Sequence, residues 1–306
     1  MRVLQAANGR VLGLTFSPDG TALAAAVEDQ GVYLWNLTAP GGPVRLDDHA
    51  TDRSGDLYFS PDGNEVGWLG WDGWKVYDRE TRVKTRQRLT AAGHLYRLIP
   101  APTADRVYSQ HNFPESEVVG WHRAGDRWVR DCEIPTDQLA VEDVTVAPDG
   151  RRLAMLTRKT VGKRWWEHPF RLELRSAVSG VVETTGEYPY NYRCSKLAFA
   201  PDGMQLVGVH EMTLLVWPVP ALGDPLLVRN DSRKHFTAAA YHPSGRYLFA
   251  ASNDATVHVY DTAGWGRLAR FSWNLGWLRA VAASPDGMLA AAGNDRGEVV
   301  VWDVDF

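Results

Sequence analysis

A short turn sequence recurs along the whole chain and constrains its fold more than any other feature. It first appears as FSPDG at residues 16–20, and six variants of it follow. The prolines of the seven copies stand at 18, 61, 102, 148, 201, 243 and 285, so they are 43, 41, 46, 53, 42 and 42 residues apart. Proline fixes φ at the first corner of a turn, and glycine accepts the left-handed conformation. The period of these turns fits one propeller blade of about 40–45 residues.

Each repeat has the pattern of a four-stranded antiparallel meander. In the first repeat, apolar runs at residues 11–17, 21–27 and 32–36 precede a short run at 43–46, with turn residues between them. In most repeats the third strand ends on an aromatic residue, at Trp35, Tyr77, Trp121, Trp217, Tyr260 and Trp302. The fourth repeat has Leu174 there instead.

Two of these strand ends carry a family resemblance. Val259-Tyr260-Asp261 and Val301-Trp302-Asp303, each preceded by an Asn-Asp turn, resemble the ends of WD repeats. The resemblance extends over the whole chain and implies an all-β, seven-bladed β-propeller. The chain departs from the WD pattern because the Gly-His pair that usually opens a repeat is absent at the expected offset. We therefore expect these blades to depend more on apolar packing than on the family's internal hydrogen-bond tetrad.

The two ends of the sequence predict how the ring closes. A lone strand is expected at residues 2–5, and the seventh third strand is expected at 299–304. Pairing them would complete the last blade and remove two exposed sheet edges. We therefore predict a single domain over residues 1–306, with no room for a linker or second domain.

Charge and cysteine content narrow the class of protein. The net charge of −4 gives no general attraction to nucleic acid or to anionic membranes. The two cysteines, Cys132 and Cys194, lie in different repeats and are expected to be unpaired thiols. The sequence has no signal-peptide core and no apolar stretch long enough to span a membrane. These features predict a cytoplasmic monomer with no membrane partner.

Catalytic chemistry finds little support in the sequence. The nine histidines show no metal-ligand spacing, and no phosphate-binding glycine pattern is present, so we predict no metal and no cofactor. The face of each first strand expected to line the channel, five residues before the turn proline, carries charges of both signs. It comprises Gly13, Asp56, Arg97, Asp143, Lys196, Ala238 and Ala280. We expect neighbouring charges to neutralise one another, which disfavours an enzyme in the central channel.

Cations and one tryptophan gather where the first strands are expected to begin, at one mouth of the ring. The residues eight positions before the turn prolines are Arg10, Arg53, His94, Ala140, Arg193, His235 and Trp277, and Arg279 follows the last by two residues. Core packing does not explain three Arg, two His and a Trp at equivalent positions. In the WD-repeat propellers that this chain resembles, this position contacts protein partners. The simpler alternative is that each cation solvates a strand end or pairs with a nearby carboxylate.

Aromatic residues in other loops of the same predicted face extend the candidate site. An insertion at about 158–169 in the fourth repeat contains Trp165 and Trp166, and the link before the fifth first strand carries Tyr188, Tyr190 and Tyr192. Trp, Tyr and Arg are enriched at binding hot spots. Other aromatics, such as Trp74 and Phe113, are expected to pack between blades.

These features favour a non-catalytic scaffold for protein interaction. The predicted site binds an acidic or phosphorylated segment through Arg10, Arg53, His94, Trp165, Trp166, Tyr190, Tyr192, Arg193, His235, Trp277 and Arg279. Binding of nucleic acid or another polyanion by the same face is the first alternative, with the net charge and the lack of a long basic stripe against it. A propeller enzyme with a channel site is the second.

Overall fold

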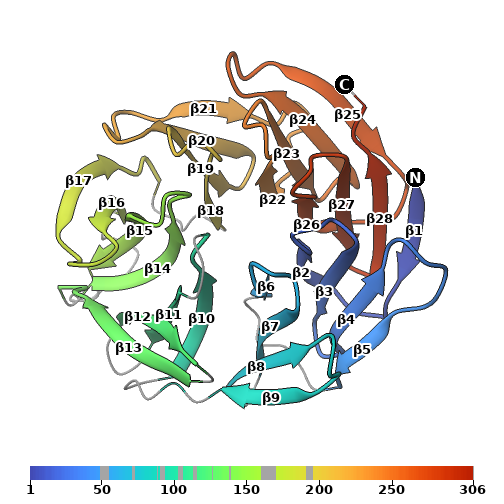
Figure 1. Cartoon of the computed structure of the whole chain (residues 1–306). Coiled ribbons are helices and arrows are strands. Elements are labelled where there is room, and N and C mark those ends of the chain that lie inside the picture. The colour runs from blue at the N-terminus through green and yellow to red at the C-terminus, as the bar shows by residue number, and fades with distance from the viewer. Residues whose placement is uncertain are drawn as a thin grey trace. The chain divides into compact units, whose positions relative to one another are not determined.

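The computed structural model contains only strands, turns and loops in the residues that it describes. These are residues 1–48, 55–70, 73–87, 89, 94–102, 106–112, 116–125, 127–137, 139–159, 170–190 and 196–305. They form seven four-stranded sheets (Figure 1). Two compact units can be distinguished, one of residues 1–87 with 230–306 and one of residues 88–229. That residues 1–306 form a single domain stays a prediction.

The first unit contains four of the sheets, and all their strand pairs are antiparallel. Three follow chain order: β2 (Val11–Phe16), β3 (Ala22–Val27), β4 (Gly31–Asn36) and β5 (Val44–Asp47); β6 (Leu57–Phe59), β7 (Glu65–Gly70), β8 (Gly73–Asp78) and β9 (Lys84–Gln87); β22 (Phe236–Tyr241), β23 (Tyr247–Ser252), β24 (Thr256–Asp261) and β25 (Arg267–Ser272). The fourth has the order β1 (Arg2–Gln5), β28 (Glu298–Asp303), β27 (Leu289–Asn294) and β26 (Leu278–Ala283).

The second unit contains the other three sheets, each an antiparallel meander in chain order. They are β10 (His94–Pro100), β11 (Arg106–Asn112), β12 (Glu117–Ala124) and β13 (Arg127–Ile134); β14 (Leu139–Val146), β15 (Arg152–Lys159), β16 (Phe170–Ser176) and β17 (Val182–Glu187); β18 (Lys196–Phe199), β19 (Gln205–His210), β20 (Thr213–Pro218) and β21 (Leu226–Arg229). The turn motif or its worn copy follows one strand of each sheet. We call these seven strands the first strands of their repeats; they are β2, β6, β10, β14, β18, β22 and β26.

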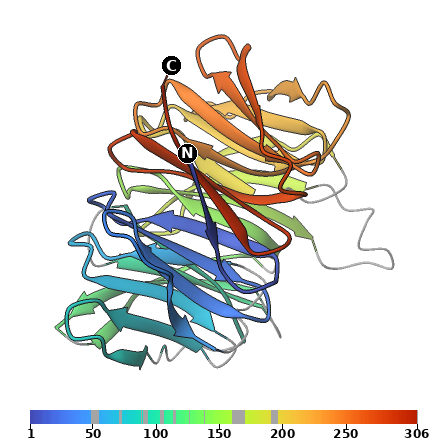
Figure 2. The ribbon, with the colours of Figure 1, turned by 90° about the vertical axis from the view of Figure 1, so that its right-hand side faces the viewer.

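The N-terminal strand completes the last sheet, as the sequence predicts. β1 pairs antiparallel with β28, with Arg2 opposite Val301 and Gln5 opposite Glu298 (Figure 2). The Met1 ammonium group lies 3.3 Å from Oδ2 of Asp303. The backbone edge of β28 is therefore covered by β1.

The recurring turns adopt the conformation that their sequence predicts. Gly20, Gly63, Gly203 and Gly287 have φ values of 70°, 75°, 70° and 75°. In the first turn, Oδ1 of Asp19 accepts hydrogen bonds from Oγ of Ser17 at 2.5 Å and from the backbone N–H of Thr21 at 3.0 Å. These hydrogen bonds lower the pKa of Asp19 to about 2. The aspartate side chain and the glycine backbone thus hold the corner together.

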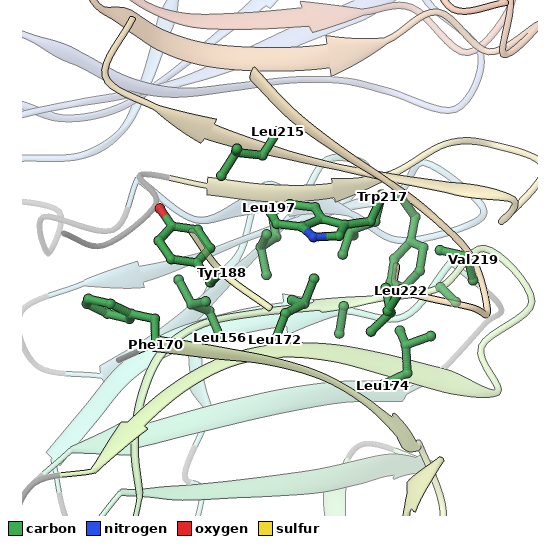
Figure 3. Close-up of a cluster of buried hydrophobic side chains, with 14 residues drawn as sticks. Leu156, Phe170, Leu172, Leu174, Tyr188, Leu197, Leu215, Trp217, Val219 and Leu222 are labelled. Atoms are coloured by element: carbon green, nitrogen blue, oxygen red, sulfur yellow. The ribbon is translucent and has the colours of Figure 1, made fainter. Parts of the chain in front are cut away.

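Apolar side chains of neighbouring sheets interlock within each unit. In the second unit, Leu172 and Leu174 of β16 pack with Leu197 of β18 and with Leu215 and Trp217 of β20 (Figure 3). The predicted aromatic column belongs to this packing, because Trp35, Trp121, Trp217, Tyr260 and Trp302 are buried in their respective sheets. Trp74 is also buried, as predicted.

Several sheets also bury hydrogen-bond networks, although the Gly-His pair is missing. In the third repeat, Nε1 of Trp121 donates to Oγ of Ser109 at 2.7 Å, and His111 lies 2.8 Å from the same oxygen. In the sixth repeat, Oγ1 of Thr256 lies 3.0 Å from Nε2 of the buried His258. The expectation of mainly apolar blades was incomplete, because histidines on other strands supply polar partners.

We predict that removing residues 1–6 lowers the stability and the solubility of the protein. The deletion strips β1 from β28 and exposes a row of unpaired backbone groups, which favours association between molecules. The melting temperature should fall by roughly 5 °C or more. Thermal denaturation followed by size-exclusion chromatography tests this, and an unchanged melting curve with a monomeric profile would contradict the structural role of β1.

We also predict that Gly20→Val costs about 1–2 kcal/mol of unfolding free energy, because valine is strained at positive φ. Gly42→Val is the matched control. Gly42 lies in a loop where a Cβ would have no heavy atom within 4 Å, and it is not among the positive-φ glycines. Chemical denaturation of both variants measures the difference, and equal stabilities would show that the turn does not require glycine.

Candidate functional site

The first strands share a register shift near the end at which they begin. It falls between Val11 and Gly13 in β2, and the shift recurs at equivalent points in β10, β14, β22 and β26. The extra residue in each case stands six positions before the turn proline, at Leu12, Tyr96, Glu142, Thr237 and Arg279. Such bulges bend a strand and redirect its side chains.

The register shift explains why the residues before it face outward. A regular strand would put the residues four and eight positions before the proline on the same face. Because of the extra residue, the position seven before the proline is buried instead, at Val11, Val141, Phe236 and Leu278. The position eight before the proline is then free to point away from the core. Apolar residues spaced by three and then two, as at Val11, Leu14 and Phe16, were the sequence signal for this bulge.

In the first unit, three of the predicted site residues directly precede the first strands β2, β22 and β26. The backbone carbonyls of Arg10, His235 and Trp277 each accept a hydrogen bond from the residue 18 positions later, at 2.8, 3.0 and 3.0 Å. β2 and β22 both contact β26, so the three residues lie at the same end of adjacent first strands. We call Arg10, His235, Trp277 and Arg279 the Arg–Trp patch.

Trp277 is the apolar centre of the Arg–Trp patch. The residue is 53% exposed. Cζ of Arg279 lies 5.3 Å from its ring centroid, within the range of a cation–π contact. The bulge in β26 places Arg279 against the indole. The patch therefore offers a guanidinium beside an exposed aromatic ring.

The charge of the Arg–Trp patch is partly compensated. His235 is exposed, and the Arg10 side chain is 54% exposed with its Nη1 atom 3.4 Å from Oε2 of Glu28. An exposed pair of this kind contributes roughly 0–1 kcal/mol, so an incoming acidic group can compete with Glu28. The simpler alternative to partner binding was that each cation pairs with a nearby carboxylate, and Arg10 makes one such contact with Glu28.

In the second unit, the tyrosines before β18 are partly committed to packing. The Tyr190 ring stacks on the His210 ring at 4.0 Å between centroids and 9° between planes. Oη of Tyr188 lies 2.9 Å from Nδ1 of His210, and Tyr188 is buried. Tyr188 is therefore a core residue, contrary to its expected place among the exposed aromatics, whereas Tyr190 remains half-buried.

Six predicted site residues fall wholly or partly outside the described part of the chain. Arg53, Trp165, Trp166, Tyr192 and Arg193 lie outside the described residues. His94 begins β10, but its side chain is not described. Their contribution to binding stays a prediction.

Two of the charges expected to face the channel, Arg97 and Asp143, neutralise one another in the second unit. Arg97 of β10 forms an ion pair with Asp143 of β14, and Asp143 is buried. Oδ2 of Asp143 also accepts a hydrogen bond from the backbone N–H of Leu197 at 2.5 Å. This carboxylate serves to join three neighbouring first strands. Across the described residues, no group of three or more His, Cys, Asp and Glu could hold a metal ion.

A second buried carboxylate ends the outer strand of the first repeat. Asp47 accepts hydrogen bonds from Nζ of Lys75 at 2.8 Å and from Nε1 of Trp68 at 3.0 Å. Burial by itself raises the pKa of Asp47, but the hydrogen bonds and the charges of Lys75 and Lys84 outweigh it and lower the value from 3.8 to about 2. Asp47 therefore ties the end of β5 to the neighbouring sheet.

The ion pair between Asp47 and Lys75 predicts that the protein loses stability in acid. Because the folded-state pKa is lowered, the stabilisation by Asp47 is full above about pH 4 and is lost as the pH falls through about 2, an effect of roughly 2 kcal/mol. Asp47→Asn should reduce the slope of unfolding free energy against pH in that window. Urea titrations across the window measure it, with Asp303→Asn, at an exposed carboxylate, as the control. Equal slopes in Asp47→Asn and wild type would contradict this role.

Comparisons with known proteins agree with the repeat architecture. The sequence profile of the family "WD domain, G-beta repeat" matches residues 1–36 and 226–261. The human serine-threonine kinase receptor-associated protein is 24% identical over 199 residues, which make up 64% of this chain and 48% of that protein. The guanine nucleotide-binding protein subunit beta of Oryza sativa subsp. indica is 21% identical over 313 residues, covering 99% of this chain and 70% of that protein.

One relative is much longer than this chain. Periodic tryptophan protein 2 of Arabidopsis thaliana is 23% identical over 279 residues, which are 84% of this chain but 29% of that protein. The chain thus spans about half the length of the human relative and less than a third of the Arabidopsis one.

Solved structures share the fold over the whole chain. The β-propeller domain of Cps50 (Swd1) from Myceliophteria thermophila superposes with a TM-score of 0.77 at 14% identity, covering 100% of this chain and 99% of that one. A chain of the mitotic checkpoint complex gives a TM-score of 0.78 at 16% identity, covering 100% and 91%. With its seven four-stranded sheets, the chain is a seven-bladed β-propeller. Its repeats resemble those of the WD-repeat family, whose profile matches two stretches of the chain.

Proposed function

We propose that this protein is a non-catalytic scaffold that binds an acidic segment of a partner protein through the Arg–Trp patch. WD-repeat propellers are typically scaffolds for protein interaction. By their names, one relative is receptor-associated, another is a subunit, and one structural neighbour belongs to a complex. These names support a role in assembly without identifying the partner of this chain.

The observation that carries the proposal is the exposed Trp277 with Arg279 stacked on it. Burying a large exposed aromatic side chain favours association, and the neighbouring cations select for negative charge. Arg10 adds a second guanidinium on one adjacent blade, and His235 adds an exposed imidazole on the other. A segment that combines an apolar anchor with carboxylates or a phosphate fits this arrangement.

Three features of the function remain parts of the proposal. The protein acts without catalysis and as a monomer, and it works in the cytoplasm. Among the residues that the structure describes, no helix is long and apolar enough to cross a membrane.

Nucleic acid is the alternative ligand for the Arg–Trp patch. Salt dependence distinguishes it from an acidic protein segment, because binding to the phosphates of a nucleic acid weakens steeply with salt.

We predict that Trp277→Ala weakens partner binding mainly by speeding dissociation. Truncating a true hot spot costs about 2 kcal/mol or more, which corresponds to roughly 30-fold faster dissociation. The matched control is Met288→Ala, which removes a 64% exposed side chain from the turn after β26, at the other end of that strand. Affinity capture from cell extract with wild type and both variants, followed by binding kinetics on the recovered partner, tests this. Equal retention by both variants would rule out Trp277 as an anchor.

We predict that Arg10→Glu slows association with an acidic ligand, most strongly at low salt, because exposed cations act mainly by steering. Arg246→Glu is the control, because it reverses an exposed charge next to the turn after β22. Binding of poly-glutamate and of single-stranded DNA at several salt concentrations provides the measurement. A steeper salt dependence for DNA, with tighter binding than poly-glutamate, would favour the nucleic-acid alternative.

A further inference from the structure

The link before β2 contains the only Asn-Gly dipeptide of the sequence, Asn8-Gly9. Glycine has no side chain to shield its backbone nitrogen, so this nitrogen can reach the side-chain carbonyl carbon of a preceding asparagine. Asn8 is exposed and lies in a bend between β1 and β2. Neither residue is among the hydrogen-bonded residues of the described chain.

The backbone on both sides of this dipeptide is held in place. The Ala6 N–H donates to the Gly297 carbonyl at 2.9 Å, and the Arg10 carbonyl accepts from the Glu28 N–H at 2.8 Å. The dipeptide itself bridges these two fixed points. Gly9 cannot be replaced cheaply, because a Cβ there would lie 2.7 Å from the Glu28 carbonyl oxygen. The fold thus requires the residue that makes Asn8 reactive.

The Asp-Gly dipeptides of the turns provide a contrast within the same chain. In the first turn, the Asp19 carboxylate is held by Ser17 and Thr21, and the Gly20 N–H donates to the Ser17 carbonyl at 2.9 Å. The turn at Asp286-Gly287 has the same pair of restraints. In both turns the attacking nitrogen and the side chain that it would attack are engaged in hydrogen bonds. Asn8-Gly9 has neither restraint.

We propose that Asn8 is a site of spontaneous deamidation that adds a negative charge beside the Arg–Trp patch. The Gly9 backbone nitrogen forms a bond to Cγ of Asn8, and the side-chain nitrogen leaves as ammonia, which gives a five-membered succinimide. Water then opens the ring to aspartate or isoaspartate. One water is consumed and one ammonia released, with no oxidation or reduction.

The new carboxylate stands two residues before Arg10. It changes the net charge from −4 to −4 − 1, or −5. In isoaspartate the backbone also gains a carbon within the link between Ala6 and Arg10. The consequence for binding, which rests on the proposed function, is that deamidated protein attracts an acidic partner less strongly. The patch would then lose activity with the age of the molecule.

Peptide mapping tests the chemistry without any partner. The intact folded protein is incubated at mildly alkaline pH and digested with trypsin, which releases residues 3–10 with Asn8 as their sole asparagine. We expect the mass of this peptide to rise by the difference between an amide and an acid. The rise should come earlier than in the peptide of residues 11–45, whose asparagine is Asn36. Asn8→Gln is the control, since its longer side chain forms the corresponding ring more slowly. Retention of the Asn8 amide for as long as that of Asn36 would overturn the proposal.

Binding of poly-glutamate tests the consequence. At low salt, Asn8→Asp should lower the association rate relative to Asn8→Gln by up to about fivefold, the ceiling for one exposed charge pair, and high salt should remove the difference. Equal rates at low salt would overturn the effect on the patch. If poly-glutamate binds none of the proteins, the proposed function fails, while the mass measurement still decides whether Asn8 deamidates.

Discussion

Burial of both faces of each sheet is the constraint on which the rest of this structure depends. A four-stranded blade has two apolar faces and cannot cover either by itself, so it is stable only between neighbours. In the first unit, Trp35 of β4 and Phe16 of β2 share a cluster with Ala291 and Val301 of the last sheet. In the second unit, Trp217 and Leu172 do the same across another pair of sheets. Burial of this kind is the main favourable term in folding.

Polar groups within this packing are tolerated because they are paired. Asp143 joins three first strands through Arg97 and the Leu197 N–H, and Asp47 receives hydrogen bonds from Trp68 and Lys75. An unpaired charge at either place would be costly to bury. The buried carboxylates are therefore part of the packing between strands and sheets, and they require no catalytic explanation.

The repeats and their turns could be predicted from the sequence because their causes are local. Proline, aspartate and glycine act within five residues, and the alternation of apolar residues is visible in a single strand. The bulge in the first strands was missed, although the spacing of Val11, Leu14 and Phe16 signals it, because strict alternation was assumed. Tyr188 could not be placed from sequence, since its burial depends on His210 and Phe170, which come from other strands.

Part of the candidate site could also be predicted, because it depends on the position of a residue within the repeat. Arg10, His235 and Trp277 occupy one position of the repeat, so counting from the turn prolines found them without knowledge of the fold. The stacking of Arg279 on Trp277 could not be found in this way, because it follows from the bulge that redirects Arg279. Counting places residues along a strand, whereas contacts between side chains depend on its irregularities.

The bulge has a consequence for how such a chain can diverge. It separates the positions that fill the core, seven and four residues before the proline, from the position eight before it, where Arg10, His235 and Trp277 are exposed. Substitutions at the outward positions leave the interlocked sheets untouched, so selection can change them independently of folding. The occupants of the outward column differ from blade to blade, as Arg10, Ala140, His235 and Trp277 show. Copies of one repeat can therefore evolve different surfaces while their cores remain the same.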